Sequence, residues 1–379
     1  MAMRTCLILI GFFFAACSSV HTNTPILNNA ADSVAIQYAK GFRIYKHDGW
    51  SELQVINPWQ GAKDVSFKYI LVRRGDPVPA ATGGIVIETP VKRVVCLSTT
   101  HIAMIDFLNE TETVVGISGT YLVSNKTILD KIDRKKVFDV GYNNNLNYEL
   151  IMGLKPDVIF AYGIDNEFAG YVRKLRELGL KVVFNAEYLE YDPLAKTEWI
   201  KFMSAFYEKL DTATAAFDTI AGRYNDLKSR LAGVTFRPRI LYGLPWNGTW
   251  YMAGGKSYAA TLIADAGGDY LWKNNTSHEA LPLSIESVYN AADSADYWIN
   301  AGAAMSMADI LAVEKRLANL NVFRQKRVYN NIAILTPQGG NDYWESGVMK
   351  PDIILKDMAS ILHPELFPER NLYYFRLLK

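Results

Sequence analysis

The chain has 379 residues, of which 50% are hydrophobic and 21% charged. This composition is typical of globular proteins rather than disordered or fibrous ones, and the length predicts two or more domains. Lys and Arg total 40 against 39 Asp and Glu, so no excess of positive charge favours DNA or RNA, and we expect no nucleic acid partner.

The first segment has the pattern of a secretory signal peptide. Arg4 precedes an apolar run over 6–16 (CLILIGFFFAA), which is much shorter than the ~20 residues that a membrane-spanning helix needs. Residues 14–17 (FAAC) resemble the lipobox of bacterial lipoproteins, in which the cysteine is lipidated and becomes the new N-terminus. We predict a signal peptide over 1–16, lipidation of Cys17 and a membrane-anchored location in the periplasm. Ordinary cleavage near residue 16 without a lipid is the alternative.

The three cysteines exclude a disulfide in the mature chain, because Cys6 lies in the signal peptide and Cys17 carries the lipid. Cys96 lies between apolar residues, so we expect a buried thiol rather than a nucleophile. The five histidines are scattered without the spacing of a metal site. We therefore predict neither a protein-bound metal site nor a resident cofactor.

A polar tether is predicted over 17–36, followed by a small N-terminal β extension over 37–90. Within the extension, three short runs rich in β-branched and aromatic residues are separated by Gly, Pro and Asp. That pattern predicts a small antiparallel meander, with strands around 42–45, 53–56 and 67–72.

From 91 to 195 the chain alternates between strand-like and helix-like segments. This alternation predicts an α/β lobe with a mostly parallel sheet covered by helices. Ligands of such sheets lie at the carboxyl ends of the strands. The candidate ligand-binding residues at those ends are Thr100, His101, Tyr121, Tyr142 and Tyr162. His101 could contact a ligand or coordinate a haem iron, but a histidine at a helix end whose ring is satisfied by the backbone is the commoner case.

A long helical region is predicted over 196–233. Trp199, Phe202 and Phe206 recur at helical spacing, and Asp211 has the residue type of an N-cap for a second helix that reaches Leu231. That second helix would span ~30 Å at ~1.5 Å per residue, so it is long enough to join two lobes.

After the helical region the alternation resumes over 234–379 and predicts a second α/β lobe. Trp246, Trp250 and Tyr251 follow a predicted strand in a loop rich in Pro, Asn and Gly, and Trp344 lies in a second Gly-rich loop. Flat aromatic side chains suit the wall of a pocket for a large, partly apolar ligand. Core packing is nearly as plausible for any one of them.

Four stretches resemble the family of periplasmic binding proteins for iron-siderophores, haem and cobalamin. The most specific is 141–151 (GYNNNLNYELI) followed by 154–159 (LKPDVI). The others are 91–98 (VKRVVCLS), 264–268 (ADAGG) and 283–288 (LSIESV), and the resemblance covers about 91–362. The resemblance implies two Rossmann-like α/β lobes with mostly parallel sheets joined by a single long α-helix, with the β extension outside the family core.

The resemblance also implies the function of a substrate-binding protein, without enzymatic activity, that delivers a metal chelate to an ABC importer. By position, Glu149 and Glu286 would be the glutamates that dock onto arginines of the importer's transmembrane subunits. We expect a monomer that binds an iron-siderophore or cobalamin between its lobes. Haem as the ligand, a secreted α/β enzyme acting on a large aromatic or chelate substrate, and an interaction protein without a small ligand remain alternatives. The chain lacks a GxSxG elbow, a phosphate loop and an HExxH helix.

Overall fold

The N-terminal extension is a five-stranded sheet in the order β1-β2-β3-β4-β5. The computed structural model describes residues 32–80, 83–142, 145–163, 168–369 and 371–379, so the predicted signal peptide and Cys17 lie outside the described residues. Strands β2, β3 and β4 form the predicted antiparallel meander, and β5 runs parallel to β4. The strands are β1 Asp32–Ser33, β2 Phe42–His47, β3 Trp50–Ile56, β4 Ser66–Arg73 and β5 Ile85–Thr89.

The predicted tether over 17–36 extends too far along the chain. Asp32 and Ser33 form β1 and pair with β2, and the backbone amide of Val34 donates to the carbonyl of Ile44 (3.0 Å). The polar composition of residues 32–34 does not indicate a strand. Their backbone groups are ordered by hydrogen bonds to a different segment, β2, which the local sequence does not reveal.

Five parallel strands form the sheet of the N-terminal lobe, in the order β10-β9-β6-β7-β8. Its four longer strands are fully buried, as expected for a parallel sheet with both faces covered. Cys96 is one of these buried residues. The strands are β6 Val94–Cys96, β7 Val114–Ile117, β8 Phe138–Asp139, β9 Val158–Ala161 and β10 Val182–Phe184. The helices are α1 Thr99–Phe107, α2 Lys126–Asp133, α3 Tyr148–Leu154 and α4 Phe168–Glu177.

A second sheet, in the order β13-β11-β15-β16-β17, forms the C-terminal lobe and is parallel except for its last pair. A separate two-stranded antiparallel sheet pairs β12 with β14. The strands are β11 Arg239–Tyr242, β12 Thr249–Met252, β13 Asp269–Tyr270, β14 Leu281–Ser284, β15 Tyr297–Ile299, β16 Val328–Asn330 and β17 Arg376–Leu377. The helices are α7 Tyr258–Asp265, α8 Ile285–Ala292, α9 Met307–Val313, α10 Asn321–Arg324, α11 Asp342–Glu345 and α12 Pro351–Leu362.

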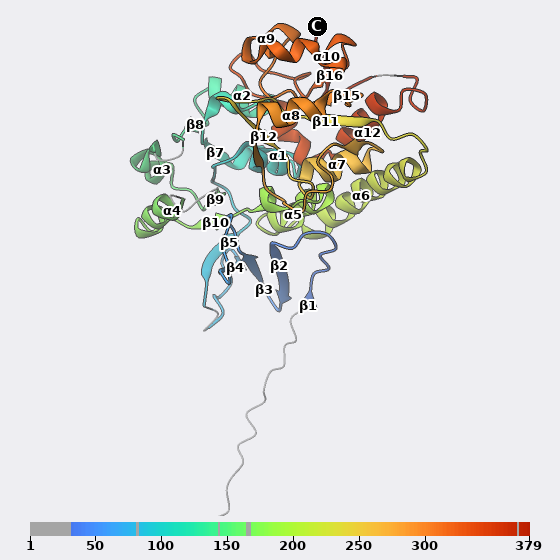
Figure 1. Cartoon of the computed structure of the whole chain (residues 1–379). Coiled ribbons are helices and arrows are strands. Elements are labelled where there is room, and N and C mark those ends of the chain that lie inside the picture. The colour runs from blue at the N-terminus through green and yellow to red at the C-terminus, as the bar shows by residue number, and fades with distance from the viewer. Residues whose placement is uncertain (1–31, 81–82, 143–144, 164–167, 370) are drawn as a thin grey trace, which may run out of the picture. The chain divides into compact units, whose positions relative to one another are not determined.

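The chain passes between the two lobes through α5 Pro193–Ala205 and α6 Leu210–Ala232. Figure 1 shows the extension strands below α5, with the yellow-green α6 running beneath α7 and α12. Helix α6 has 23 residues, which correspond to ~35 Å at ~1.5 Å per residue. The prediction that Asp211 is the N-cap of this helix is wrong, because α6 begins at Leu210 and its N-cap is Lys209. The Asp211 carboxylate pairs instead with Lys46 (3.1 Å). The predicted fold class is confirmed.

Two buried carboxylates hold the start of the extension against α5. Glu198 is fully buried and accepts hydrogen bonds from the backbone amides of Gln37, Tyr38 and Ala39 (2.7–2.9 Å) and from Lys201 Nζ (2.8 Å). Glu190 accepts from the next two backbone amides and from the indole of Trp199. These hydrogen bonds hold residues 37–41, at the start of the extension, against α5.

None of the described helices combines the length and the apolar composition needed to cross a bilayer.

Candidate functional site

Three tyrosines gather at the carboxyl ends of β7, β8 and β9. A Cβ atom at Gly119 would lie 3.2 Å from the ring of Tyr142 and 3.4 Å from the ring of Tyr121. Burial raises the pKa of Tyr162, and the neighbouring Tyr142, Glu187 and Tyr121 raise it further. The carboxyl ends of parallel strands share one edge of a sheet, which brings these separate loops together.

Asp139, at the end of β8, positions the loops that carry two of these tyrosines. Its carboxylate accepts hydrogen bonds from the hydroxyl and amide of Thr120 (2.7 and 3.0 Å) and from the amide of Gly141 (2.9 Å). Burial opposes ionisation of Asp139, but these hydrogen bonds outweigh it and hold its pKa below the ordinary value. Sequence reasoning missed this residue, although an aspartate that ends a strand just before a glycine is a signal for it.

Gly141 allows the second of these loops to turn tightly. It has φ +87°, and a Cβ atom there would lie 2.1 Å from the carbonyl oxygen of Asn145. A side chain at this position would therefore force the loop of Tyr142 apart.

Thr100 lies beside a buried carboxylate at the ends of β6 and β10. Its hydroxyl donates to Glu187 Oε1 (2.5 Å). Glu187 is only 3% exposed, and its Oε2 atom has no hydrogen-bond partner among the described residues. Burial raises the pKa of Glu187. Glu187 was not among the residues predicted from the sequence.

The prediction that His101 contacts ligand is wrong, because its side chain is fully buried. Burial lowers the pKa of His101 to about 3, so the imidazole is neutral at physiological pH. Its ring packs edge-on against Phe160 at 6.1 Å. His101 is therefore a core residue of α1. The expected alternative, a ring satisfied by the backbone, is not found either, because neither ring nitrogen has a hydrogen-bond partner among the described residues.

Three aromatic residues of the C-terminal lobe lie on β12 or just before it. Trp246 and Tyr251 are 67% and 50% exposed, and their ring centroids lie 6.4 Å apart. The prediction that Trp250 lines the ligand site is wrong: its side chain is fully buried, and its indole donates to the carbonyl of Tyr242 (3.1 Å). Successive residues of a strand face opposite sides, so Tyr251 faces outward where Trp250 faces the core.

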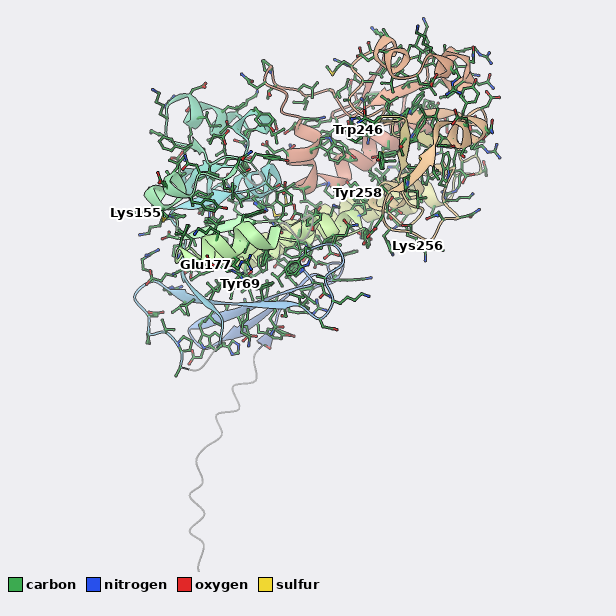
Figure 2. All side chains as sticks on the ribbon, turned by 60° about the vertical axis from the view of Figure 1, so that its left-hand side comes forward. Tyr69, Lys155, Glu177, Trp246, Lys256 and Tyr258 are labelled. Carbon is green, nitrogen blue, oxygen red and sulfur yellow. The ribbon has the colours of Figure 1, made fainter. Side chains whose placement is uncertain are left out.

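A further group of tyrosines lies in the C-terminal lobe and was not predicted. Tyr242 ends β11, Tyr258 begins α7, and the amide of Asn300 donates to the Tyr242 hydroxyl (2.5 Å). Figure 2 shows Trp246 and Tyr258 on the side of this lobe that faces the blue-green N-terminal lobe. Lys196 Nζ, at the start of α5, lies 5.0 Å from the ring centre of Tyr258.

Trp344 lies on α11, where the two lobes are in direct contact. It is 53% exposed and packs edge-on against Tyr343 at 4.8 Å. The next residue, Glu345, is buried and accepts a hydrogen bond from the backbone amide of Ser124 (2.7 Å), while Asp342 accepts from the Ser124 hydroxyl (3.0 Å). Since Ser124 follows Tyr121 by three residues, this junction connects candidate ligand residues of both lobes.

We expect the junction to make folding stability depend on pH. Burial raises the pKa of Glu345 to about 7, against an ordinary value of 4.5. The folded state therefore binds this proton more tightly than the unfolded state, and the stability gained below pH 4.5 is lost as the pH rises through about 7. Denaturant titrations at about pH 5 and pH 8 should show a loss of roughly 3 kcal/mol from this group.

The side chain of the Glu345→Gln variant cannot ionise. The variant should therefore lack the part of the stability loss between about pH 5 and pH 8 that comes from this group. Glu177→Gln provides the control, because Glu177 is an exposed residue of α4. Equal pH dependence in Glu345→Gln and the unmodified protein would contradict this assignment.

The two glutamates of the predicted docking surface occupy equivalent helix positions. Glu149 is the second residue of α3 after the N-cap Asn147, and Glu286 is the second residue of α8 after the N-cap Ser284. Both are exposed, and they lie on different lobes. Glu286 already pairs with Arg316 (3.2 Å).

One cavity, of about 480 Å³, lies between the extension strands and the start of α6. Four charged residues on its rim form two ion pairs, Lys46 with Asp211 and Arg73 with Glu208 (both 3.1 Å). In the described part of the chain, no cluster of three or more His, Cys, Asp or Glu side chains could hold a metal ion.

Residues 94–331 match the model of a family described as periplasmic binding protein, which is more than half of the chain. The chain therefore belongs to the periplasmic binding protein family, and the predicted resemblance is confirmed. The predicted class of binding protein is thus confirmed at the level of the family.

A relative in sequence is an uncharacterized lipoprotein of Methanocaldococcus jannaschii, which is 27% identical over an alignment of 382 positions. The alignment covers 94% of this chain and 88% of the relative. A periplasmic binding protein of Veillonella parvula has a similar solved structure, with a TM-score of 0.58 and 15% identity over 80% of this chain and 96% of that one. The periplasmic vitamin B12 binding protein of Vibrio cholerae aligns with a TM-score of 0.51 and 16% identity over 73% of this chain and 99% of that one. At these identities the structural likeness shows the fold alone.

Proposed function

We propose that the protein is a lipid-anchored carrier in the periplasm that binds a metal chelate, either an iron-siderophore or cobalamin, between its two lobes. It then delivers the chelate to the membrane permease of an ABC importer. The observation that carries this proposal is the set of partly exposed aromatic side chains on both lobes: Tyr121, Tyr142, Tyr162, Trp246, Tyr251 and Trp344.

Large chelates with apolar, flat surfaces suit such a site. Each Å² of apolar surface that a ligand removes from water contributes about 25 cal/mol, and a few polar groups fix the orientation. The structural neighbours include a vitamin B12 binding protein and haem binding proteins, so the choice of chelate rests on the side chains of the site. The burial of His101 removes the observation that favoured haem.

Docking through Glu149 and Glu286 is part of the same proposal. The carboxylates occur at matching helix positions on separate lobes, so each lobe presents one exposed acidic group. Charge-assisted hydrogen bonds from arginines of the importer would then engage both lobes at once. Lipidation of Cys17 would keep the carrier near the importer, and we propose that it works as a monomer.

The proposal is tested by titrating the purified protein with cyanocobalamin and with ferric hydroxamate and catecholate complexes, followed by calorimetry. We expect saturable binding of one chelate class and no conversion of the bound compound. Product formation from the bound chelate would favour an enzyme. An absence of binding across these probes would contradict the carrier.

Replacing Trp246 and Tyr251 together with alanine should weaken chelate binding. If each ring covers about 60–100 Å² of apolar ligand surface, the loss of one costs about 1.5–2.5 kcal/mol, so the loss of both should weaken binding by more than about a hundredfold. Phe236→Ala is the control, because Phe236 is an exposed aromatic residue away from β12 and β14. Unchanged titration curves for the double variant would exclude both residues from the site.

A further inference from the structure

The loops after the strands of the N-terminal lobe are acidic. Carboxylates lie at two strand ends, Asp139 after β8 and Glu187 after β10. The described residues that follow the five strands contain no lysine or arginine: 97–101, 118–124, 140–142, 162–163 and 185–190. The edge that carries the three tyrosines therefore has negative charge without a compensating cation from its own loops.

The C-terminal lobe repeats this charge pattern. Its three central strands, β11, β15 and β16, are followed by 243–248, 300–306 and 331–345, which also lack lysine and arginine. The acidic residues there are Asp342 and Glu345, which flank Trp344 and make the hydrogen bonds to Ser124. Both faces of the proposed site thus carry aromatic rings and a carboxylate, Asp139 on one lobe and Asp342 on the other, whereas burial raises the pKa of Glu345 to about 7 and leaves it partly protonated at neutral pH.

Lys196 lies close to this edge, but its ammonium group already has partners within the protein. Its Nζ donates to the carbonyl of Tyr188 (3.1 Å) and lies over the ring of Tyr258 at 5.0 Å. Its charge also acts on Glu187, which it helps to keep ionised. An anionic ligand would have to compete with these partners for it.

Glu187 adds an acceptor that is ready for a ligand. One carboxylate oxygen is held by Thr100, whereas Oε2 has no partner among the described residues although the side chain is 97% covered. The carboxylate lies near the tyrosines, because the ring of the next residue, Tyr188, packs against the ring of Tyr162 at 6.0 Å. A buried acceptor without a donor is costly, so a donor group from the ligand, or water that the ligand orders, would satisfy it.

From these observations we infer that the ligand is a chelate of neutral or positive overall charge that offers hydrogen-bond donors, and that the site discriminates against anionic chelates. This inference rests on the proposed function. It favours corrinoids and hydroxamate complexes over tris-catecholate complexes, because the carboxylates on both lobes repel an anion and no free cation at the described strand ends attracts one.

The test is a charge series on a single ligand skeleton. Aquocobalamin, cyanocobalamin and dicyanocobalamin carry charges of about +1, 0 and −1, and a ferric trihydroxamate and a ferric tris-catecholate extend the comparison to a second skeleton. Within the skeleton that binds, we expect each added negative charge to weaken binding by about tenfold or more, and added salt to reduce this difference.

Glu187→Gln should narrow the charge preference, and more strongly as the pH rises, because burial raises the pKa of Glu187 and the variant removes the charge of its ionised form while keeping the shape of the side chain. Glu177→Gln, on the exposed face of α4, should leave the preference unchanged. Thermal melting checks that both variants are folded. If a variant does not fold, the charge series measured on the unmodified protein still tests the inference.

Anionic members that bind as tightly as neutral ones, or more tightly, would overturn the charge inference while leaving the carrier intact. Failure of every chelate to bind would overturn the proposed function and the inference with it.

Discussion

A Glu149→Ala/Glu286→Ala double variant is expected to lose chelate uptake while it binds the chelate with unchanged affinity. Each glutamate lies at the second position of an exposed helix start, so neither contributes to the core. A charge-assisted hydrogen bond contributes about 1.5–3 kcal/mol, so losing one on each lobe should weaken docking by about a hundredfold or more. Uptake is measured with the importer reconstituted in vesicles, and affinity by titration of the isolated protein.

The matched control replaces one exposed glutamate on each lobe outside the docking positions, Glu177→Ala with Glu369→Ala. This control carries the same change of net charge, so normal uptake with it would exclude a general electrostatic effect. If the Glu149/Glu286 variant lost affinity for the chelate instead of uptake, both residues would belong to the binding site and the docking role would be wrong.

Replacing Glu198 with alanine is expected to destabilise the folded protein by about 3–5 kcal/mol, the cost of breaking a buried ion pair. The change leaves the backbone amides of residues 37–39 and the ammonium of Lys201 without their acceptor. Unpaired buried donors are costly because no water replaces the lost partner. Denaturant titration gives the loss of stability, and hydrogen exchange at residues 37–41 shows whether the segment detaches.

Glu198→Gln provides a milder variant in case the alanine variant does not fold, because the amide keeps one acceptor oxygen. Glu177→Ala is the control for removal of a helical glutamate from the surface. A loss below about 1 kcal/mol for Glu198→Ala, with unchanged exchange at residues 37–41, would show that the segment is held by other contacts.

The candidate site was predictable where it depends on the position of a loop along the chain. Tyr121 and Tyr162 each follow a buried strand, and Tyr142 follows the short, exposed β8. Strands of a parallel sheet end at one edge, so the grouping of the three tyrosines follows from topology. Trp250 and His101 were assigned to the wrong side, because position along the chain does not tell which way a side chain points. Both side chains face the core.

Other features depend on partners that are distant in sequence. Glu198 binds the amides of residues that precede it by about 160 positions, and Ser124 binds carboxylates more than 200 positions later. A single glutamate in a helix has no local feature that distinguishes a buried clamp from a solvated side chain. Glu187 was missed for the same reason.

The sequence by itself determined the two α/β lobes, the meander of the extension, the helical connection and the family, because hydrophobic periodicity and short motifs are local properties of the chain. Only the tertiary structure decided which aromatic rings are exposed, which carboxylates are buried and which residues join the lobes. Burial and pairing depend on the surfaces that packing brings together, and those surfaces come from segments far apart in the chain.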